Sequence, residues 1–317
     1  MAASKGDNGS VHIRRWGLVS AMTILETKRI LVTGAAGCAG SAITALLRSK
    51  GYNVVAHARR AAPGIDWVAD LGSLSAGGYA FPSDVAAVVH CAGANPSRSN
   101  AFARDNAAAT VELAALLETA ASLRQVIHLS SVAVYKRPPS GCWIISENAE
   151  TVDVNDPGAD PHACSKRSSE LELESLARKR PGVKLTQLRA SSIYGPGVVL
   201  TRLLPTLVAR ARRNDPLQLY GPRDYVQNFI HVQDVAELAM AILLDDGAPR
   251  VVVNAFSDDT YKVAALAELV KVGVGSRSQI VDATDDAVVP EAVYVNTRAK
   301  QFHPRFRRLA DHLPDAS

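Results

Sequence analysis

Three glycines recur at three-residue intervals in TGAAGCAG, residues 33–40, between an apolar run, RILVTG, and a helix-like segment, AGSAITALLRSKG. Gly34 allows a tight turn, Gly37 lets the backbone approach a pyrophosphate, and Gly40 lets the helix pack close to the strand. The start of the following helix offers free N–H groups and a partial positive charge to phosphates. This setting predicts a strand–loop–helix unit that binds a dinucleotide. We expect its contacts at Gly34, Ala36, Gly37, Cys38, Ala39 and Gly40.

From Arg29 onward, short β-branched runs alternate with Ala/Leu-rich helical stretches. Near-continuous apolar strands separated by helices indicate a parallel sheet that is covered on both faces. The sequence therefore predicts an α/β fold, with a Rossmann-like doubly wound parallel sheet and a small C-terminal α/β lobe for a substrate. We expect a flexible extension at residues 1–25 and the dinucleotide-binding domain at 26–195, with 226–255 returning to it. The small lobe then comprises mainly residues 196–317.

The composition argues against several other classes of protein. The net charge of +4 over 317 residues is too small to indicate a nucleic-acid partner. The apolar stretch 30–47 is interrupted by three glycines, and the first residues lack an apolar core with a cleavage site, so we expect neither a membrane span nor a secretory signal. The four cysteines form no C-x-x-C pair and no cluster with histidine at ligand spacing, which favours a cytoplasmic protein without disulfides or a metal site.

The end of the second strand-like run bears on which dinucleotide binds. An acidic residue there would hold the ribose hydroxyls of NAD, but the run ends in Ala58, Arg59 and Arg60. Arginine can bind a 2′-phosphate through paired charge-assisted hydrogen bonds, so we expect NADP to be preferred, with NAD as the alternative. The other interpretation of the two arginines is a pair of solvent-facing loop charges. Asp70 is placed to reach the adenine amino group.

The chain from about Lys28 to Phe256 resembles the extended short-chain dehydrogenases, the NAD(P)-dependent nucleotide-sugar epimerase/dehydratase family. TGAAGCAG is similar to the family's T-G-x-x-G-x-x-G, and VVHCAGA to its V-x-H-x-A-A. DNAAAT is similar to N-x-x-x-T, LSSVAVY to S-S-x-x-V-Y, and LRASSIYGPG to L-R-x-x-x-x-Y-G-P-G. NFIHVQDVAEL resembles D-F-x-H-V-x-D-x-A.

The resemblance implies a catalytic set of Ser131, the residue at position 162 and Lys166, in which the lysine holds the nicotinamide ribose and the serine steadies the substrate oxygen. It implies further cofactor contacts at Leu71, Cys91, Ala92, Gly93, Asn106, Lys166 and Ser192. It implies substrate contacts at Asn95, Ser131, Val132, Ser191, Gln227 and Asn228. It also implies a homodimer through the helices that follow Asn106 and surround Lys166.

The sequence departs from the family at His162, where relatives carry the tyrosine that exchanges a proton with the substrate hydroxyl. His162 and Lys166 stand at i and i+4, so both lie on one helix face. Neutral imidazole has a donor and an acceptor nitrogen and can take up and return an alcohol proton. Three interpretations stay open: His162 is the acid–base, or Ser131, a water or Tyr135 does this work, or the site is not catalytic.

Two further departures bear on the reaction. Family dehydratases carry an acidic pair directly after the catalytic serine or threonine, but Val132 and Ala133 stand here, which disfavours 4,6-dehydration. Gln227 replaces an arginine that grips the nucleotide diphosphate in many relatives. The candidates to compensate for that charge are Arg202, Arg210 and Arg223.

We therefore expect a cytoplasmic NAD(P)-dependent oxidoreductase that acts by hydride transfer on a nucleotide-sugar, as an epimerase or a ketoreductase. The alternative is an NADP-binding regulator or scaffold that has lost catalysis.

Overall fold

A computed structural model describes residues 27–94, 101–198 and 203–316, the last three of these as backbone alone. Its centre is a seven-stranded sheet in the order β11-β7-β5-β4-β1-β2-β3, and every neighbouring pair is parallel. These strands are β1 (Arg29–Thr33), β2 (Asn53–Ala58), β3 (Trp67–Val68), β4 (Val85–His90), β5 (Gln125–Ser131), β7 (Lys184–Ala190) and β11 (Arg250–Ala255). The strand order reverses between β1 and β4, and in such sheets ligands bind outside the carboxyl ends of the strands at this point.

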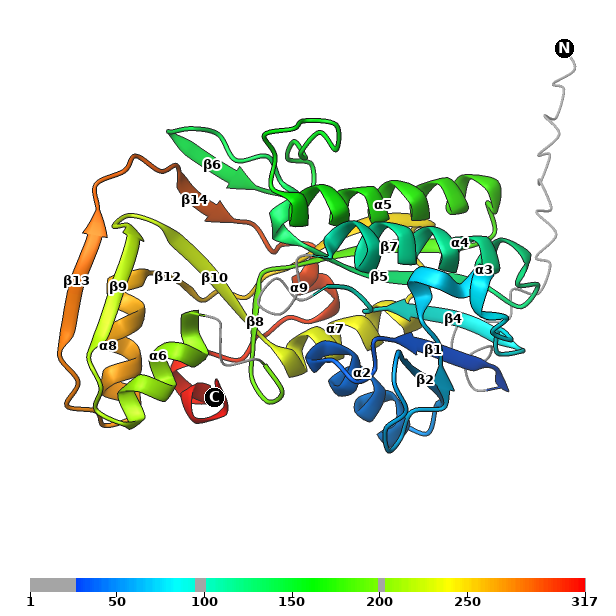
Figure 1. Cartoon of the computed structure of the whole chain (residues 1–317), viewed down its shortest axis with the longest axis horizontal. Coiled ribbons are helices and arrows are strands. Elements are labelled where there is room, and N and C mark those ends of the chain that lie inside the picture. Colours follow the sequence, from blue (N-terminus) through cyan, green and yellow to red (C-terminus); the bar gives the residue numbers. More distant parts are fainter. Residues whose placement is uncertain (1–26, 95–100, 199–202, 317) are drawn as a thin grey trace, which may run out of the picture.

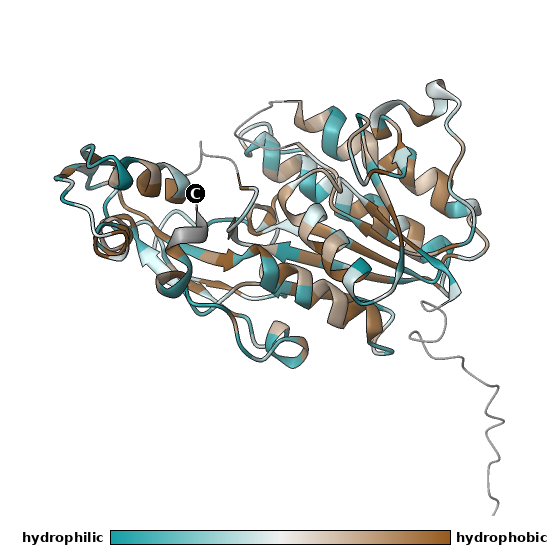
Figure 2. Cartoon of the chain, turned by 90° about the horizontal axis from the view of Figure 1, so that it is seen from below, coloured by the Kyte–Doolittle hydropathy of each residue, from teal (hydrophilic) through white to brown (hydrophobic). Residues whose placement is uncertain are grey.

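Helices cover both faces of the sheet, as Figure 1 shows. One face carries α2 (Cys38–Ser49), α7 (Val232–Leu244) and α9 (Ala299–Phe302), and the other α3 (Leu74–Gly77), α4 (Ala109–Thr119) and α5 (Pro161–Lys179). Each face has its own apolar core, and Figure 2 shows hydrophobic residues concentrated in the strands between the helices. The expected doubly wound α/β fold is confirmed.

Short helical turns follow three strands of this sheet at their carboxyl ends. They are η1 (Leu71–Ser73) after β3, the π-helix η2 (Ala103–Ala108), which leads directly into α4, and η3 (Val132–Val134) after β5. A π-helix is rare and is found mostly at functional sites. These turns bring the side chains predicted to be functional to one edge of the sheet.

A smaller lobe packs beside the sheet around a separate apolar core (Figure 1). It contains β8 (Ser192–Tyr194), α6 (Leu203–Arg212), β9 (Leu217–Pro222), β10 (Val226–His231), β12 (Thr260–Lys262), α8 (Val263–Gly273), β13 (Ile280–Asp285) and η4 (Leu309–Ala316). The strands pair as β12-β10-β8 and β13-β9. A further pair joins β6 (Cys142–Ile145) to β14 (Glu291–Tyr294), so a segment from before residue 195 lies against the C-terminal part of the chain.

The predicted segment 226–255 divides between the two regions. Its strand β10 belongs to the small lobe, whereas α7 and β11 return to the large sheet. The predicted extension at residues 1–25 lies outside the described residues. In the described parts of the chain, no helix combines the length and the apolar character that crossing a bilayer requires.

Candidate active site

The glycine loop joins β1 to α2 with little space for side chains. Gly34 has a φ of +68°, and a Cβ at this position would stand 2.7 Å from the Ala92 nitrogen. A Cβ at Gly40 would collide with the Gly34 carbonyl. Helix α2 begins after Gly37, and no side chain caps its first N–H groups. A close-packed loop with an uncapped helix start fits the pyrophosphate of a dinucleotide, as the sequence predicted.

His57 supports this loop from β2, and sequence reasoning missed it. Its Nδ1 accepts a hydrogen bond from the Gly34 N–H (3.4 Å), and its Nε2 therefore donates to the Ala69 carbonyl (3.0 Å). Burial lowers the pKa of His57, which is consistent with a neutral ring that has one acceptor and one donor nitrogen. The only signal in the sequence is a histidine inside an otherwise apolar strand.

Four charged side chains form a network where β2 and β3 end. Arg59 donates to Asp105 (3.1 Å), which also accepts from Arg104 (2.9 Å), and Arg104 contacts Asp70. Asp70 is therefore paired with an arginine, and its other oxygen accepts from the Gly72 N–H (3.1 Å). Arg60 is exposed, and Leu71 is buried in the core below α4.

Lys166 on α5 lies close to Gly93, which follows the carboxyl end of β4. Its Nζ donates to the Leu129 carbonyl (3.0 Å), and burial lowers its pKa to about 8. A Cβ at Gly93 would stand 3.1 Å from this Nζ and 2.5 Å from Asn106 Oδ1. Asn106 Oδ1 accepts from the Ala94 N–H (2.9 Å). The structure thus brings together three residues predicted to contact the cofactor, and a side chain at position 93 would displace Asn106 or Lys166.

Cys91 and Asn106 complete the surroundings of Lys166. Burial raises the pKa of the Cys91 thiol to about 12 although Lys166 opposes this shift, so the thiol is neutral. Asn106 Nδ2 donates to Ser165 Oγ (2.8 Å), which fixes the amide between η2 and α5. The Lys166 ammonium therefore has a neutral thiol beside it.

Beneath Lys166 lie a buried ion pair and two histidines. Glu170, one helical turn further along α5, receives two hydrogen bonds of 2.8 Å from Arg189 on β7. His90 and His128 stack on neighbouring strands with ring centroids 5.4 Å apart. Burial and the charge of Lys166 lower the pKa of His128 to about 4. The helix that carries Lys166 is therefore joined to β7 by the buried pair of Glu170 and Arg189.

Ser131 ends β5 and is half-buried. Its Oγ accepts from the Ala133 N–H (3.2 Å), which caps the turn η3. Tyr135 follows this turn with 2% exposure, and its hydroxyl donates to Asn254 Oδ1 (2.5 Å). The Arg189 guanidinium lies over the Tyr135 ring, 4.6 Å from its centroid. Because the phenol is committed to a buried structural contact, the interpretation in which Tyr135 exchanges the proton does not fit this geometry.

His162 is the second residue of α5 and is half-buried. The Asp160 carboxylate caps the helix by accepting from the Ala163 N–H (3.0 Å). The imidazole packs edge-on against Phe102, with ring centroids 5.4 Å apart. Phe102 immediately precedes η2, and Asn106 lies within it. The same short segment therefore carries the ring that packs on His162 and the amide near Lys166.

The residues predicted to bind substrate differ in their surroundings. Ser191 is 7% exposed, and its hydroxyl has no hydrogen-bond partner among the described residues. Gln227 Nε2 donates to Ser192 Oγ (2.6 Å). Asn228 is buried and donates to the Ser257 and Asp259 carbonyls, which gives it a structural role in the lobe. Asn95 lies outside the described residues.

Two of the three arginines expected to compensate for Gln227 make contacts elsewhere. Arg223 pairs with Asp282 and Asp286 at the tip of the lobe. Arg210 donates to the Pro216 carbonyl (3.2 Å), and Arg202 lies outside the described residues.

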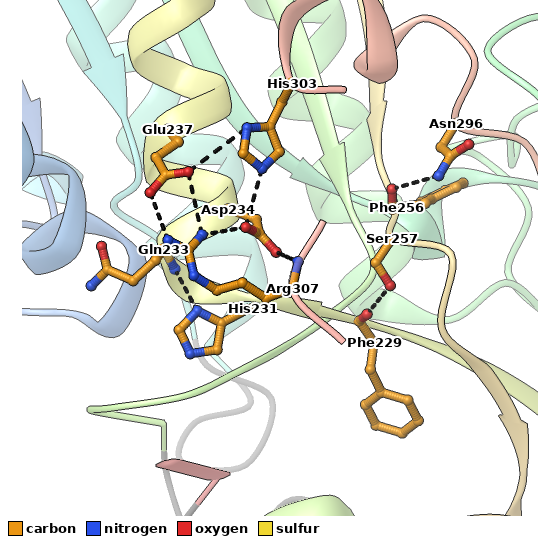
Figure 3. A network of polar contacts seen from close by, with 10 residues as sticks. All are labelled: Phe229, His231, Gln233, Asp234, Glu237, Phe256, Ser257, Asn296, His303 and Arg307. Carbon is orange, nitrogen blue, oxygen red and sulfur yellow. Dashed lines mark hydrogen bonds and ion pairs between the residues drawn. The ribbon is translucent and has the colours of Figure 1, made fainter. Parts of the chain in front are cut away.

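The C-terminal segment is fixed to α7 by the charged cluster in Figure 3. Buried Asp234 accepts from His303 Nε2 (3.1 Å) and from the Arg307 N–H (2.9 Å). The Arg307 guanidinium contacts Asp234 and donates to Glu237 (2.8 Å). The two carboxylates and His303 could together ligate a metal ion, but the guanidinium already supplies the positive charge between the carboxylates. This cluster ties the end of the chain to the large domain.

The parallel sheet, the glycine loop before the uncapped start of α2, and the position of Lys166 and Asn106 around Gly93 fit a dinucleotide-binding enzyme of the short-chain dehydrogenase type. The profile of the NAD dependent epimerase/dehydratase family matches residues 30–255. The chain belongs to this family, and the predictions of the family and of an NAD(P)-dependent enzyme are confirmed.

Known proteins similar to the chain include reductases and epimerases. A dTDP-4-dehydro-6-deoxy-D-allose reductase of Streptomyces bikiniensis is 24% identical over 280 residues, which cover 80% of this chain and 83% of the relative. The structure of MoeE5 in complex with UDP-glucose and NAD aligns with a TM-score of 0.75, 23% identity and coverage of 91% and 97%. The structure of UDP-glucuronic acid 4-epimerase from Bacillus cereus aligns with a TM-score of 0.73, 20% identity and the same coverage.

Proposed function

We propose that the chain is an epimerase or a ketoreductase that acts on a nucleotide-sugar. The observation that carries this proposal is the packing of Lys166 and Asn106 around Gly93, just beyond the carboxyl end of β4, where a nicotinamide ribose would lie. The similar reductase and the NAD-bound structures with UDP-sugars support the substrate class. When bound, the dinucleotide takes and returns a hydride.

The side chains of this chain would bind, orient and move a proton. The Lys166 ammonium would hold the ribose hydroxyls while the Leu129 carbonyl fixes its direction. The Ser131 hydroxyl, at the end of β5, would hydrogen-bond to the reacting oxygen of the sugar. His162 would take the proton from that oxygen during oxidation and return it during reduction, because neutral imidazole has an acceptor nitrogen.

Elimination of water is not part of this proposal. Dehydration needs a second acid and base beside the sugar, and Val132 and Ala133 follow Ser131 with apolar side chains. The hydroxyl of Ser191, which has no hydrogen-bond partner in the described part of the chain, and the amide of Gln227 would contact the nucleotide-sugar. Gln227 brings hydrogen bonds but no charge to the diphosphate.

Arg59 and Arg60 would allow the site to accept NADP, because both residues follow the end of β2.

Two further features of the chain bear on its assembly and its compartment. The exposed Val111 on α4 and Leu171 on α5 leave apolar surface for a homodimer through these helices, which light scattering of Leu171→Glu would test. The four free cysteines support a reducing, cytoplasmic compartment.

The decisive variant is His162→Ala. We expect it to abolish turnover, measured as the absorbance change of the nicotinamide with a panel of UDP- and dTDP-sugars, while dinucleotide affinity changes by less than about threefold. His162→Tyr restores the family's residue and is expected to remain active. Full turnover by His162→Ala would refute the role of the imidazole. A wild-type chain that binds the dinucleotide and turns over no sugar of the panel would support the regulator or scaffold instead.

A further inference from the structure

A carboxylate stands beside the arginine that would select the dinucleotide. Asp105 lies on η2, and its two oxygens pair with Arg59 (3.1 Å) and Arg104 (2.9 Å). The Asp105 side chain is 9% exposed, whereas Arg59 is 56% exposed. With Asp70 paired to Arg104, the network holds two positive and two negative charges. The guanidinium of Arg59 is therefore already neutralised before any ligand binds.

This pairing changes what Arg59 can offer to a ligand. A 2′-phosphate that binds Arg59 must approach a buried carboxylate of the same sign, or displace it from the guanidinium. Like charges at a few ångströms disfavour each other strongly where the surroundings are partly buried. A ribose with a free 2′-hydroxyl meets no such opposition. The sequence shows no acidic residue at the end of β2, but the structure supplies one there from η2.

We propose that Asp105 is a specificity-determining residue that limits the preference for NADP and keeps NAD as an accepted cofactor. The inference rests on the proposed function, since it concerns the same dinucleotide site. The choice between NADP and NAD then depends on the opposite charges of Arg59 and Asp105 together, and not on the arginine alone. The NAD-dependent character of the family is consistent with this balance.

The test is the ratio of NADPH to NADH affinity, measured by calorimetry at fixed ionic strength. Asp105→Asn keeps the shape and removes the charge, and we expect it to raise the ratio about tenfold or more, as the freeing of one charge-assisted contact implies. Glu118→Gln, which removes a carboxylate from an exposed pair at the far end of α4, is the matched control and leaves the ratio unchanged. An unchanged or lowered ratio in Asp105→Asn would overturn the inference.

Arg59→Ala completes a double-mutant cycle. In the wild-type background we expect Arg59→Ala to lower NADPH affinity by less than about fivefold, because Asp105 has already neutralised the guanidinium. In the Asp105→Asn background the same change is expected to cost at least about tenfold. Should Asp105→Asn not fold, a tenfold loss in Arg59→Ala alone contradicts the inference. A wild-type chain that binds neither dinucleotide overturns the proposed function itself, whereas binding with an unshifted ratio overturns only the role of Asp105.

Discussion

The charge of Lys166 is expected to set the pH range in which the protein holds its cofactor. Burial lowers the pKa of this ammonium to about 8, so about nine-tenths of the molecules carry the charge at pH 7 and about one-tenth at pH 9. If the charged form holds the nicotinamide ribose, NADH affinity falls about tenfold between these two values. Unperturbed lysine would show no such change until near pH 10.

Loss of folding does not explain a decline in this range. Because the pKa of Lys166 in the folded chain lies below that in the unfolded chain, the folded state binds fewer protons between pH 8 and 10.5. The contribution of Lys166 to the free energy of unfolding therefore rises with pH across this window. The titration of Lys166 therefore does not destabilise the fold in this window, and a decline in affinity with a midpoint near pH 8 is expected from its loss of charge at the binding site.

The assay is NADH fluorescence or calorimetry at half-unit steps from pH 6.5 to about 9.5. Lys166→Met, which keeps the length of the side chain without the charge, is the matched variant. It is expected to bind weakly and with no pH dependence around 8. A wild-type affinity that stays flat to pH 9, or a midpoint near 10, would refute the reasoning.

Three further predictions concern the supports of the site. Glu170→Gln leaves a buried guanidinium without its carboxylate and is expected to lower the free energy of unfolding by about 3–5 kcal/mol in denaturant titrations. Glu118→Gln removes a carboxylate from an exposed pair, and we expect it to have little effect on the free energy of unfolding in the same assay. Burial lowers the pKa of His128 to about 4 in the folded chain, so about 3 kcal/mol of stability is lost as pH falls from 6.5 towards 4. In acid titrations, His128→Gln is expected to reduce the dependence of the free energy of unfolding on pH in this range. Tyr135→Phe removes the donor to buried Asn254 and is expected to cost about 1–3 kcal/mol while turnover persists; loss of turnover with stability intact would restore Tyr135 as a proton donor.

Much of the fold could be predicted from local patterns. The glycine loop, the apolar strands and the spacing of the helices specify strand–helix units, and parallel units bring their carboxyl ends to one edge. The resemblance to the family motifs, and not periodicity, implied that Ser131, Asn106 and Lys166 belong to one site. In the structure Ser131 ends β5, Asn106 lies within η2, and Lys166 is the sixth residue of α5.

The contacts that the sequence did not reveal join distant segments. Arg59 and Asp105 are 46 residues apart, and their pairing depends on the winding of η2. Asp70 was predicted to reach the adenine amino group, and in the structure its carboxylate contacts Arg104. The pairing of β6 with β14 likewise joins segments with no shared local pattern. Such contacts follow from packing, which periodicity does not encode.

The π-helix η2 makes the spacing of this segment as important as its composition. A turn of this type contains about one residue more than an α-helical turn, and each α-helical residue rotates the chain by about 100°. Deleting one residue from 103–108 would let the segment continue into α4 as a regular α-helix. The residues before the deletion would then rotate about the helix axis by about 100°. Phe102 would leave His162, and Asn106 and Asp105 could not both keep their partners. We therefore expect η2 to accept no single-residue deletion or insertion, because either change would separate Asp105 and Asn106 from their partners.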